Sequence, residues 1–254
     1  MSSLAIGATV FACTFGGAII GLLLRGFLPE RHLNAETKDV IKFAIGIIGT
    51  MAALVLGLLV GSAKATFDTQ RDGLAQLSAS VIYLDRILAH YGPEAREPRQ
   101  TLRDSLADMM DKTWPHLSPN GTQAGATSDT SGRYEVMFDQ VQALTPRTDA
   151  QRVLQTSALD ILKDIAKTRW SLFAHQNGSI SLPFFVVVVS WFALILAAFG
   201  LFAPPNAVVV AALLVSSLVL SSAIFLVSEL DRPFHGIIQI SSAPLQNALS
   251  ELGK

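Results

Sequence analysis

The chain has 254 residues, of which half are apolar and only 15% are charged, and its formal net charge is −1. A soluble domain normally carries about 25% charged residues, so this composition and a mean hydropathy of +0.44 indicate a membrane protein. The near-zero net charge gives no indication of nucleic-acid binding, which requires a concentrated basic face. The single cysteine, Cys13, excludes an intrachain disulfide.

Residues 4–24 are the first predicted membrane span. This run carries no charged side chain and is long enough to cross a bilayer. No basic region precedes it, as one would in a signal peptide, so we expect an uncleaved helix. Within the run, Gly17 and Gly21 form a GxxxG pair, which favours the close approach of another helix.

Residues 43–63 are the second predicted span, and its helix is expected to continue to Tyr91 because only Gly73 interrupts the sequence beyond the membrane. A helix of about 50 residues is roughly 75 Å long, more than twice the thickness of the membrane core. Outside the membrane, large apolar residues follow the 3–4 spacing of a helix that packs on another helix. These residues are Phe67, Leu74, Leu77, Val81, Leu84, Leu88 and Tyr91.

Residues 65–182 are the predicted soluble part, and none of its segments has the pattern of a strand. Gly92 and Pro93 end the long helix. Helices are expected over about 94–113, 134–144 and 148–173, with a surface loop at 115–132. Thr148 and Gln151 match a capping box at the start of the last helix. That helix repeats the 3–4 spacing and is the expected antiparallel partner of the long helix in a stalk-like bundle; its repeating residues are Leu154, Ala158, Ile161, Ile165 and Leu172.

Residues 183–228 are predicted to hold the third and fourth spans, at about 184–202 and 207–228, joined by the turn 203–206. Residues 229–254 follow as a juxtamembrane segment with a short helix near 244–252. With the first pair of spans in 1–64, the expected class is an all-α membrane protein. It has four transmembrane helices and a helical bundle between the second and the third.

Four spans place both termini and the bundle on the same side of the membrane. The positive-inside rule compares basic residues near the ends of the spans. The connection after the first span holds four (Arg25, Arg31, Lys38, Lys42), and the bundle side holds five (Lys64, Arg71, Lys167, Arg169, Arg232). The charge rule therefore leaves the orientation open.

Three parts of the chain resemble the bacterial bestrophin-like proteins. The first part is the stretch Gly61–Arg71. The second consists of Leu84–Arg86 together with His90–Pro93, and the third of Glu229–Phe234 together with Ser241–Leu245. More distantly, the chain is similar to the bestrophin anion channels, which assemble as pentamers around a pore lined by the second span. The resemblance implies a homo-oligomer, a pentamer, in the lipid bilayer of a bacterial inner membrane. It also implies cytoplasmic termini and bundle, and inorganic anions such as chloride as the conducted species.

The resemblance further implies where a pore would narrow. Bestrophins carry constriction residues four apart around a Val-Leu-Gly core, and residues 54–58 are similar. This places an apolar constriction, able to gate by dewetting, at Thr50, Leu54 and Leu58. The acidic calcium-binding run that follows the fourth span in bestrophins is replaced here by residues 235–238, so no calcium site is expected.

The second span also carries small residues at every fourth position: Gly49, Ala53, Gly57, Gly61 and Ala65. Such a stripe is more typical of a helix-packing seam than of a narrow pore. Lys42 and Lys64 bracket the span and, with Ser62, would ring the two mouths of a pore in an oligomer. The alternative is that both lysines only anchor the helix at the membrane interface.

Four charged residues lie just outside the bilayer on the bundle side: Arg71, Glu229, Asp231 and Arg232. We expect the two carboxylates to pair with Arg71, Arg232 or Lys64, and so to tie the exit of the second span to that of the fourth. The alternative is independent solvation, because exposed pairs contribute little.

Enzyme chemistry finds no support in the sequence. The five histidines lack metal-ligand spacing, and there is no phosphate loop or nucleophile elbow. No catalytic residue, metal or cofactor is therefore expected. Two functions remain: an oligomeric, anion-conducting channel lined by the second span, or a non-conducting membrane scaffold or sensor whose bundle recruits a partner. The oligomeric state separates them.

Overall fold

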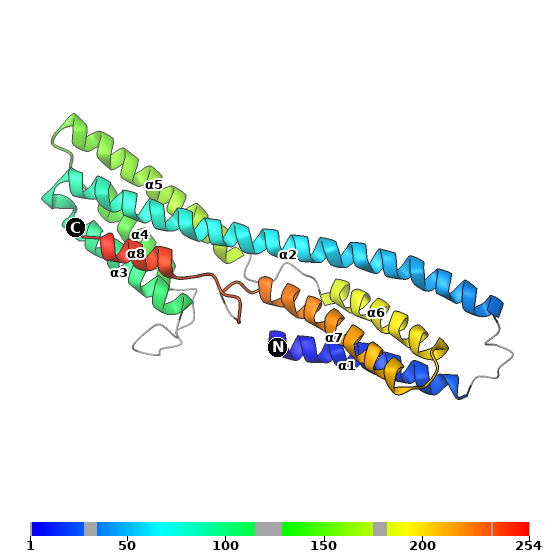
Figure 1. Ribbon diagram of the computed structural model, residues 1–254. Helices are drawn as coiled ribbons and strands as arrows, with labels where there is room; N and C mark the ends of the chain where they lie inside the picture. Colours follow the sequence, from blue (N-terminus) through cyan, green and yellow to red (C-terminus); the bar gives the residue numbers. More distant parts are fainter. Residues whose placement is uncertain (1, 28–34, 115–128, 175–181, 235, 254) are drawn as a thin grey trace. The chain divides into compact units, whose positions relative to one another are not determined.

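The computed structural model describes residues 2–27, 35–114, 129–174, 182–234 and 236–253, and every regular element in these ranges is helical (Figure 1). The predicted all-α class is confirmed. The elements are α1 (Ser3–Arg25), α2 (Ala35–Tyr91), the 3-10 turn η2 (Pro93–Ala95), α3 (Arg96–Thr113), α4 (Asp129–Gln142), α5 (Asp149–Ala174), α6 (Leu182–Phe202), α7 (Ala207–Leu230) and α8 (Ala243–Glu251).

The chain forms two compact units, and α2 contributes to both. The first unit combines Met1–Phe67 with Gly178–Ile238, and the second combines Asp68–Asn177 with Gln239–Lys254. The first therefore contains α1, the apolar half of α2, α6 and α7. The second contains the polar half of α2, together with α3, α4, α5 and α8.

Four helices in the described residues are long and apolar enough to cross a membrane, which confirms the predicted number of spans. They are Ser3–Arg25, Lys38–Tyr91, Pro183–Phe202 and Ala207–Leu230. Local chemistry sets two of their starts. The Ser2 hydroxyl accepts a hydrogen bond from the Ala5 amide (3.3 Å), and the Asn206 side chain accepts one from the Val209 amide (2.8 Å). Both are N-caps that satisfy amides at the open end of a helix.

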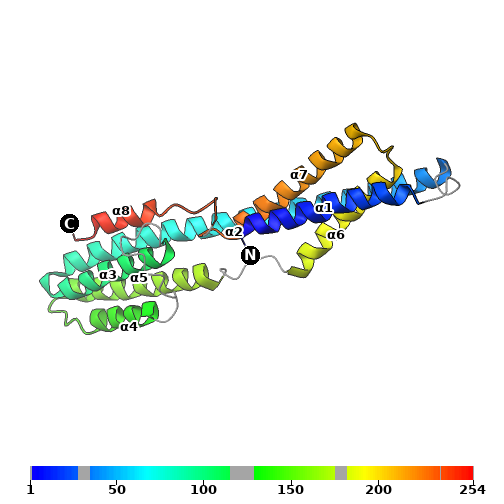
Figure 2. The same cartoon turned by 90° about the horizontal axis from the view of Figure 1, so that it is seen from below.

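In the first unit, α1 packs along α6 and α7, as Figures 1 and 2 show. The predicted GxxxG pair lies on the α6 side. A Cβ atom added at Gly17 would lie 2.9 Å from the Ala193 carbonyl oxygen, and one at Gly21 would collide with the Ala197 carbonyl. Gly200 on α6 faces the Ala18 carbonyl in the same way. The two backbones approach so closely that only glycine fits, as the motif predicts.

The apolar half of α2 packs on the other spans through one narrow side. Its buried residues Ala52, Leu59 and Ala63 join Val10 of α1 and buried residues of α6 and α7 in a single apolar cluster. Ile45 extends the same side, so Ile45, Ala52 and Leu59 are spaced seven residues apart. This seven-residue spacing is that of a helix-packing seam.

In the second unit, the predicted seam of α2 is confirmed. Six of its seven predicted residues are each at most 3% exposed: Leu74, Leu77, Val81, Leu84, Leu88 and Tyr91. The seventh, Phe67, is half-buried and packs in the first unit. Two contacts show that α5 runs antiparallel to α2. Leu172 contacts Gly73, where an added Cβ would lie 3.1 Å from the leucine side chain. At the other end, the side-chain amide of Gln151 donates to the Tyr91 carbonyl (2.9 Å).

The capping box of α5 is present, with a second role. The Thr148 hydroxyl accepts a hydrogen bond from the backbone amide of Gln151 (3.2 Å), and the Gln151 side-chain oxygen accepts one from the backbone amide of Arg147 (2.8 Å). Since the same side chain donates to Tyr91, it caps both the start of α5 and the end of α2. The inner face of α5 is slightly rotated from the predicted one, because Leu162 is fully buried whereas Ile161 is only half-buried.

The start of α4 differs from the sequence prediction. Helix α4 begins at Asp129, inside the predicted loop 115–132; residues 115–128 of that loop lie outside the described residues. The short C-terminal helix α8 packs within the second unit. The Ser78 hydroxyl donates to the Pro244 carbonyl (2.6 Å), and the Trp114 indole donates to the Ile240 carbonyl (3.2 Å).

Candidate functional site

The three candidate constriction residues lie on the exposed side of α2. Within the first unit, Leu54 is 64% and Leu58 73% exposed, and Thr50 is also exposed. The Thr50 hydroxyl donates to the Gly46 carbonyl of its own helix (2.9 Å). Because that donor is already satisfied, these positions form a predominantly apolar strip that no part of the described chain covers.

The small-residue stripe also lies on the side of α2 that faces away from the other spans. A Cβ atom added at Gly49, Gly57 or Gly61 would meet nothing within 4 Å among the described atoms, and Ala53 is exposed. No atom of the described residues therefore lies close to the side of α2 at these three glycines. Within one chain, the packing seam of α2 is the Ile45–Ala63 side.

The two predicted mouth lysines are separated by 22 residues of continuous helix. At 1.5 Å per residue they lie about 33 Å apart along the axis, close to the ~30 Å thickness of a bilayer core. Lys42 pairs with Asp39 at 3.4 Å, both largely exposed. The Lys64 ammonium lies over the Phe67 ring, 5.7 Å from its centroid. Ser62, one residue before the end of the predicted span 43–63, is exposed.

Glu229 is the most buried of the predicted juxtamembrane residues, at 2% exposure. One carboxylate oxygen accepts from the Ile237 amide (2.6 Å) and from the Ile238 amide (3.1 Å). The Ser3 hydroxyl also hydrogen-bonds the carboxylate, and Arg232 adds a favourable electrostatic interaction. Glu229 therefore closes the turn after α7 and ties it to the start of α1.

The turn that Glu229 closes requires glycine at position 236. Gly236 has φ +117°, a value that other residues rarely adopt, and an added Cβ would lie 2.5 Å from the Glu229 carboxylate. Of the other predicted pairing residues, Asp231 is half-buried, Arg232 is exposed, and Arg71 lies on α2 in the second unit. The predicted pairing of the two carboxylates with basic side chains stays a prediction.

A buried ion pair in the second unit was not predicted from the sequence. Asp85, 2% exposed, accepts two hydrogen bonds from Arg99 of α3, at 2.7 Å from Nε and 2.9 Å from Nη2. The Gly253 amide approaches the same carboxylate at 3.4 Å. The carboxylate raises the pKa of Arg99 by stabilising its charged form. Asp85 thereby joins α2, α3 and the C-terminal segment, which explains why a carboxylate occupies a buried position.

The helices and candidate faces above define a four-span, all-α membrane protein. A family model for the bestrophin-like domain matches residues 12–245, so the chain belongs to the bestrophin-like family. No curated protein matches the chain.

Solved structures of a bacterial bestrophin homologue from Klebsiella pneumoniae have the same fold. For one point variant the TM-score is 0.71 at 15% identity, with 99% of this chain and 97% of the other covered. For a second variant the TM-score is 0.69 at 14% identity, with coverage of 96% and 97%. A structure described as a membrane protein matches with a TM-score of 0.70 at 13% identity and 96% coverage of each chain.

Proposed function

We propose that the chain assembles into a homo-oligomeric ion channel of bestrophin type, a pentamer, which conducts anions such as chloride through a pore lined by α2. Membership of the bestrophin-like family and the fold shared with a bacterial bestrophin homologue support this proposal. The single observation that carries it is the uncovered side of α2. The buried contacts of this membrane helix with its own chain centre on Ala52, Leu59 and Ala63, whereas Leu54 and Leu58 are exposed.

The two exposed strips of α2 suit the two contacts that a ring requires. Successive residues of a helix are separated by about 100°, so Gly57 and Leu58 project in different directions from the same turn. If the Thr50–Leu54–Leu58 strip faces the ring axis, the small-residue stripe faces a neighbouring subunit. Small residues allow that neighbour to approach closely.

A ring of leucines at the axis forms an apolar constriction. Water and ions leave such a constriction when it is narrow, and the pore then closes by dewetting. Leu54 and Leu58 are one turn apart, so each would form its own ring, with the Thr50 ring one further turn away. The gate would therefore extend over two to three helical turns.

The lysines at the two ends of the span account for anion selectivity in this proposal. In an oligomer, Lys42 and Lys64 form a ring of positive charge at each mouth. Such rings raise the local concentration of anions and the rate at which they enter. The proposed orientation places Lys64, both termini and the bundle in the cytoplasm of a bacterial cell.

Recordings of the purified protein in planar lipid bilayers test conduction. We expect anion currents, and larger unitary currents from Leu54→Ala and Leu58→Ala, because a smaller side chain widens the constriction. The control is Val208→Ala, at a position of α7 that is 77% exposed but lies on another span; its currents should equal those of the wild type. Lys64→Gln should lower the ratio of chloride to sodium permeability without preventing assembly.

A well-assembled oligomer without current, or currents that both leucine substitutions leave unchanged, would contradict the proposal. The chain would then be a membrane scaffold or sensor whose bundle recruits a partner. A monomer or dimer in detergent would exclude the ring itself.

A further inference from the structure

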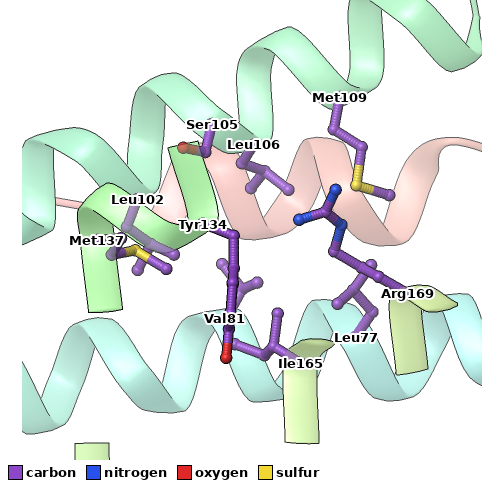
Figure 3. A pocket seen from close by; sticks show the side chains of 10 residues that line it. All are labelled: Leu77, Val81, Leu102, Ser105, Leu106, Met109, Tyr134, Met137, Ile165 and Arg169. Carbon is purple, nitrogen blue, oxygen red and sulfur yellow. The ribbon is translucent and has the colours of Figure 1, made fainter. Parts of the chain in front are cut away.

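The second unit contains a pocket between α2, α3, α4 and α5 (Figure 3). Its wall is formed mainly by apolar side chains: Leu77, Val81, Leu102, Leu106, Met109 and Ile165. The cavity volume is about 40 Å³, whereas one water molecule needs about 10–15 Å³ on the same measure. The pocket can therefore hold a small ion or a few waters, and it is too small for an organic ligand.

Arg169 of α5 brings a positive charge into this apolar surrounding. Figure 3 shows its guanidinium extending toward the side chains of α3, beside Met109. Its Nε atom is buried and has no hydrogen-bond partner among the described residues. Burial also lowers the pKa of Arg169, because removal from water disfavours the charged form.

Neither of the other polar groups in the pocket compensates that charge. The Tyr134 hydroxyl donates to the Leu162 carbonyl (3.0 Å) and is already engaged. The Ser105 hydroxyl is buried and also lacks a partner among the described residues. No Asp or Glu side chain lines the pocket in the described part of the chain. The pocket thus contains a half-buried guanidinium and a second donor without a partner, but no carboxylate. It is a site that lacks negative charge.

We propose that this pocket binds a small monovalent anion, of the size of a halide or nitrate, which pairs with the Arg169 guanidinium. Arginine presents up to five N–H donors and keeps its charge at any physiological pH. A charge-assisted hydrogen bond to an anion removes the cost of leaving a buried donor unpaired. One arginine balances one negative charge, and the small volume disfavours sulfate, phosphate and larger carboxylates. The competing occupant is water.

Since the pocket lies between four helices of one unit, an anion in it stabilises their packing. This inference concerns a binding site in the bundle, and it does not require that the membrane helices conduct. It gives the bundle a means of responding to the anion concentration on its side of the membrane.

Thermal unfolding of the full-length protein in detergent tests the site, with chloride, bromide or nitrate compared with gluconate at equal ionic strength. A ligand at a tenfold excess over its dissociation constant should raise the midpoint by roughly 3 °C. Arg169→Met keeps the apolar length of the side chain and should abolish this rise. The matched control is Lys167→Met, two residues away on the same helix and 79% exposed, which should retain it.

Anomalous diffraction from crystals soaked in bromide locates the ion directly, and it needs no variant if Arg169→Met fails to fold. We expect a bromide peak beside the Arg169 guanidinium, and none there with Arg169→Gln. A water peak without anomalous signal at that position would overturn the proposal. So would an equal rise of the unfolding midpoint in the wild type and in folded Arg169→Met.

Discussion

At the level of single residues, the buried Asp85–Arg99 pair makes the sharpest prediction about stability. Replacing Asp85 with Asn leaves the Arg99 guanidinium without its counter-charge and weakens two hydrogen bonds of 2.7 and 2.9 Å. We expect a loss of about 2–3 kcal/mol in the free energy of unfolding, measured by denaturant unfolding of the purified protein. Asp160→Asn is the control, because its pair with Lys163 is largely exposed and should contribute at most about 0.5 kcal/mol. Similar losses from both variants would contradict this assignment.

Glu229 makes a second prediction at this scale. In Glu229→Gln the remaining oxygen can still accept from the Ile237 and Ile238 amides, but these bonds lose their charge, and the second oxygen becomes an NH2 group that cannot accept a hydrogen bond. The expected cost is about 1–3 kcal/mol, seen as a lower thermal midpoint and faster proteolysis near the start of α1. Glu135→Gln, at an exposed position of α4, should change neither. If Glu229→Gln were proteolysed near the start of α1 at the same rate as the wild type, the carboxylate would not hold the start of α1 in place.

These two residues also show where sequence reasoning ends. A charged residue beside a membrane span is visible in the sequence, but the partners of Glu229 are mostly backbone amides eight and nine residues further on. No pattern of side chains encodes such a contact. Asp85 was likewise visible only as part of a family resemblance. Its burial depends on how α3 and the C-terminal segment fold back onto α2.

At the level of secondary-structure elements, periodicity predicted contacts wherever the partner helix belongs to the same chain. The 3–4 spacing of Leu74–Tyr91 and the GxxxG pair both correspond to buried helix contacts. The small-residue stripe of α2 has an equally regular spacing, yet nothing in the described chain lies within 4 Å of a Cβ added at its glycines Gly49, Gly57 and Gly61. Spacing identifies a face of a helix, whereas the nature of what covers it depends on tertiary and quaternary structure.

The α1–α6 contact can be tested with two glycines of the same helix. Gly21→Ala places a methyl group against the Ala197 carbonyl, so α1 must move away from α6. Overpacking of this kind costs about 1–3 kcal/mol, which a detergent-dependent unfolding assay can measure. Gly16→Ala is the control, since an added Cβ there meets nothing within 4 Å. Equal stability of the two variants would mean that the backbones are not in close contact.

At the level of the whole molecule, the apolar exposed side of α2 must be covered by lipid or by another chain, and a cysteine scan distinguishes these two. The only cysteine, Cys13, is exposed on α1, so a Cys13→Ala background comes first. In that background, Leu58→Cys should form disulfide-linked dimers in native membranes, because side chains at a narrow ring axis come within the ~4 Å Cβ–Cβ separation that a disulfide requires. Val208→Cys, on an exposed part of α7, should remain monomeric if that part faces lipid.

The yield of the Leu58→Cys reaction also reports the symmetry of the assembly. In a closed ring of identical chains, each subunit presents the same residue to the axis. One cysteine per chain can link chains only in pairs, so a pentamer always leaves one chain unpaired and complete oxidation stops at about four fifths of the protein. A dimer or a tetramer would reach full conversion. If about one fifth of the Leu58→Cys protein stays monomeric after complete oxidation, the result supports the pentamer. The absence of any cross-link would show that Leu58 does not face the axis.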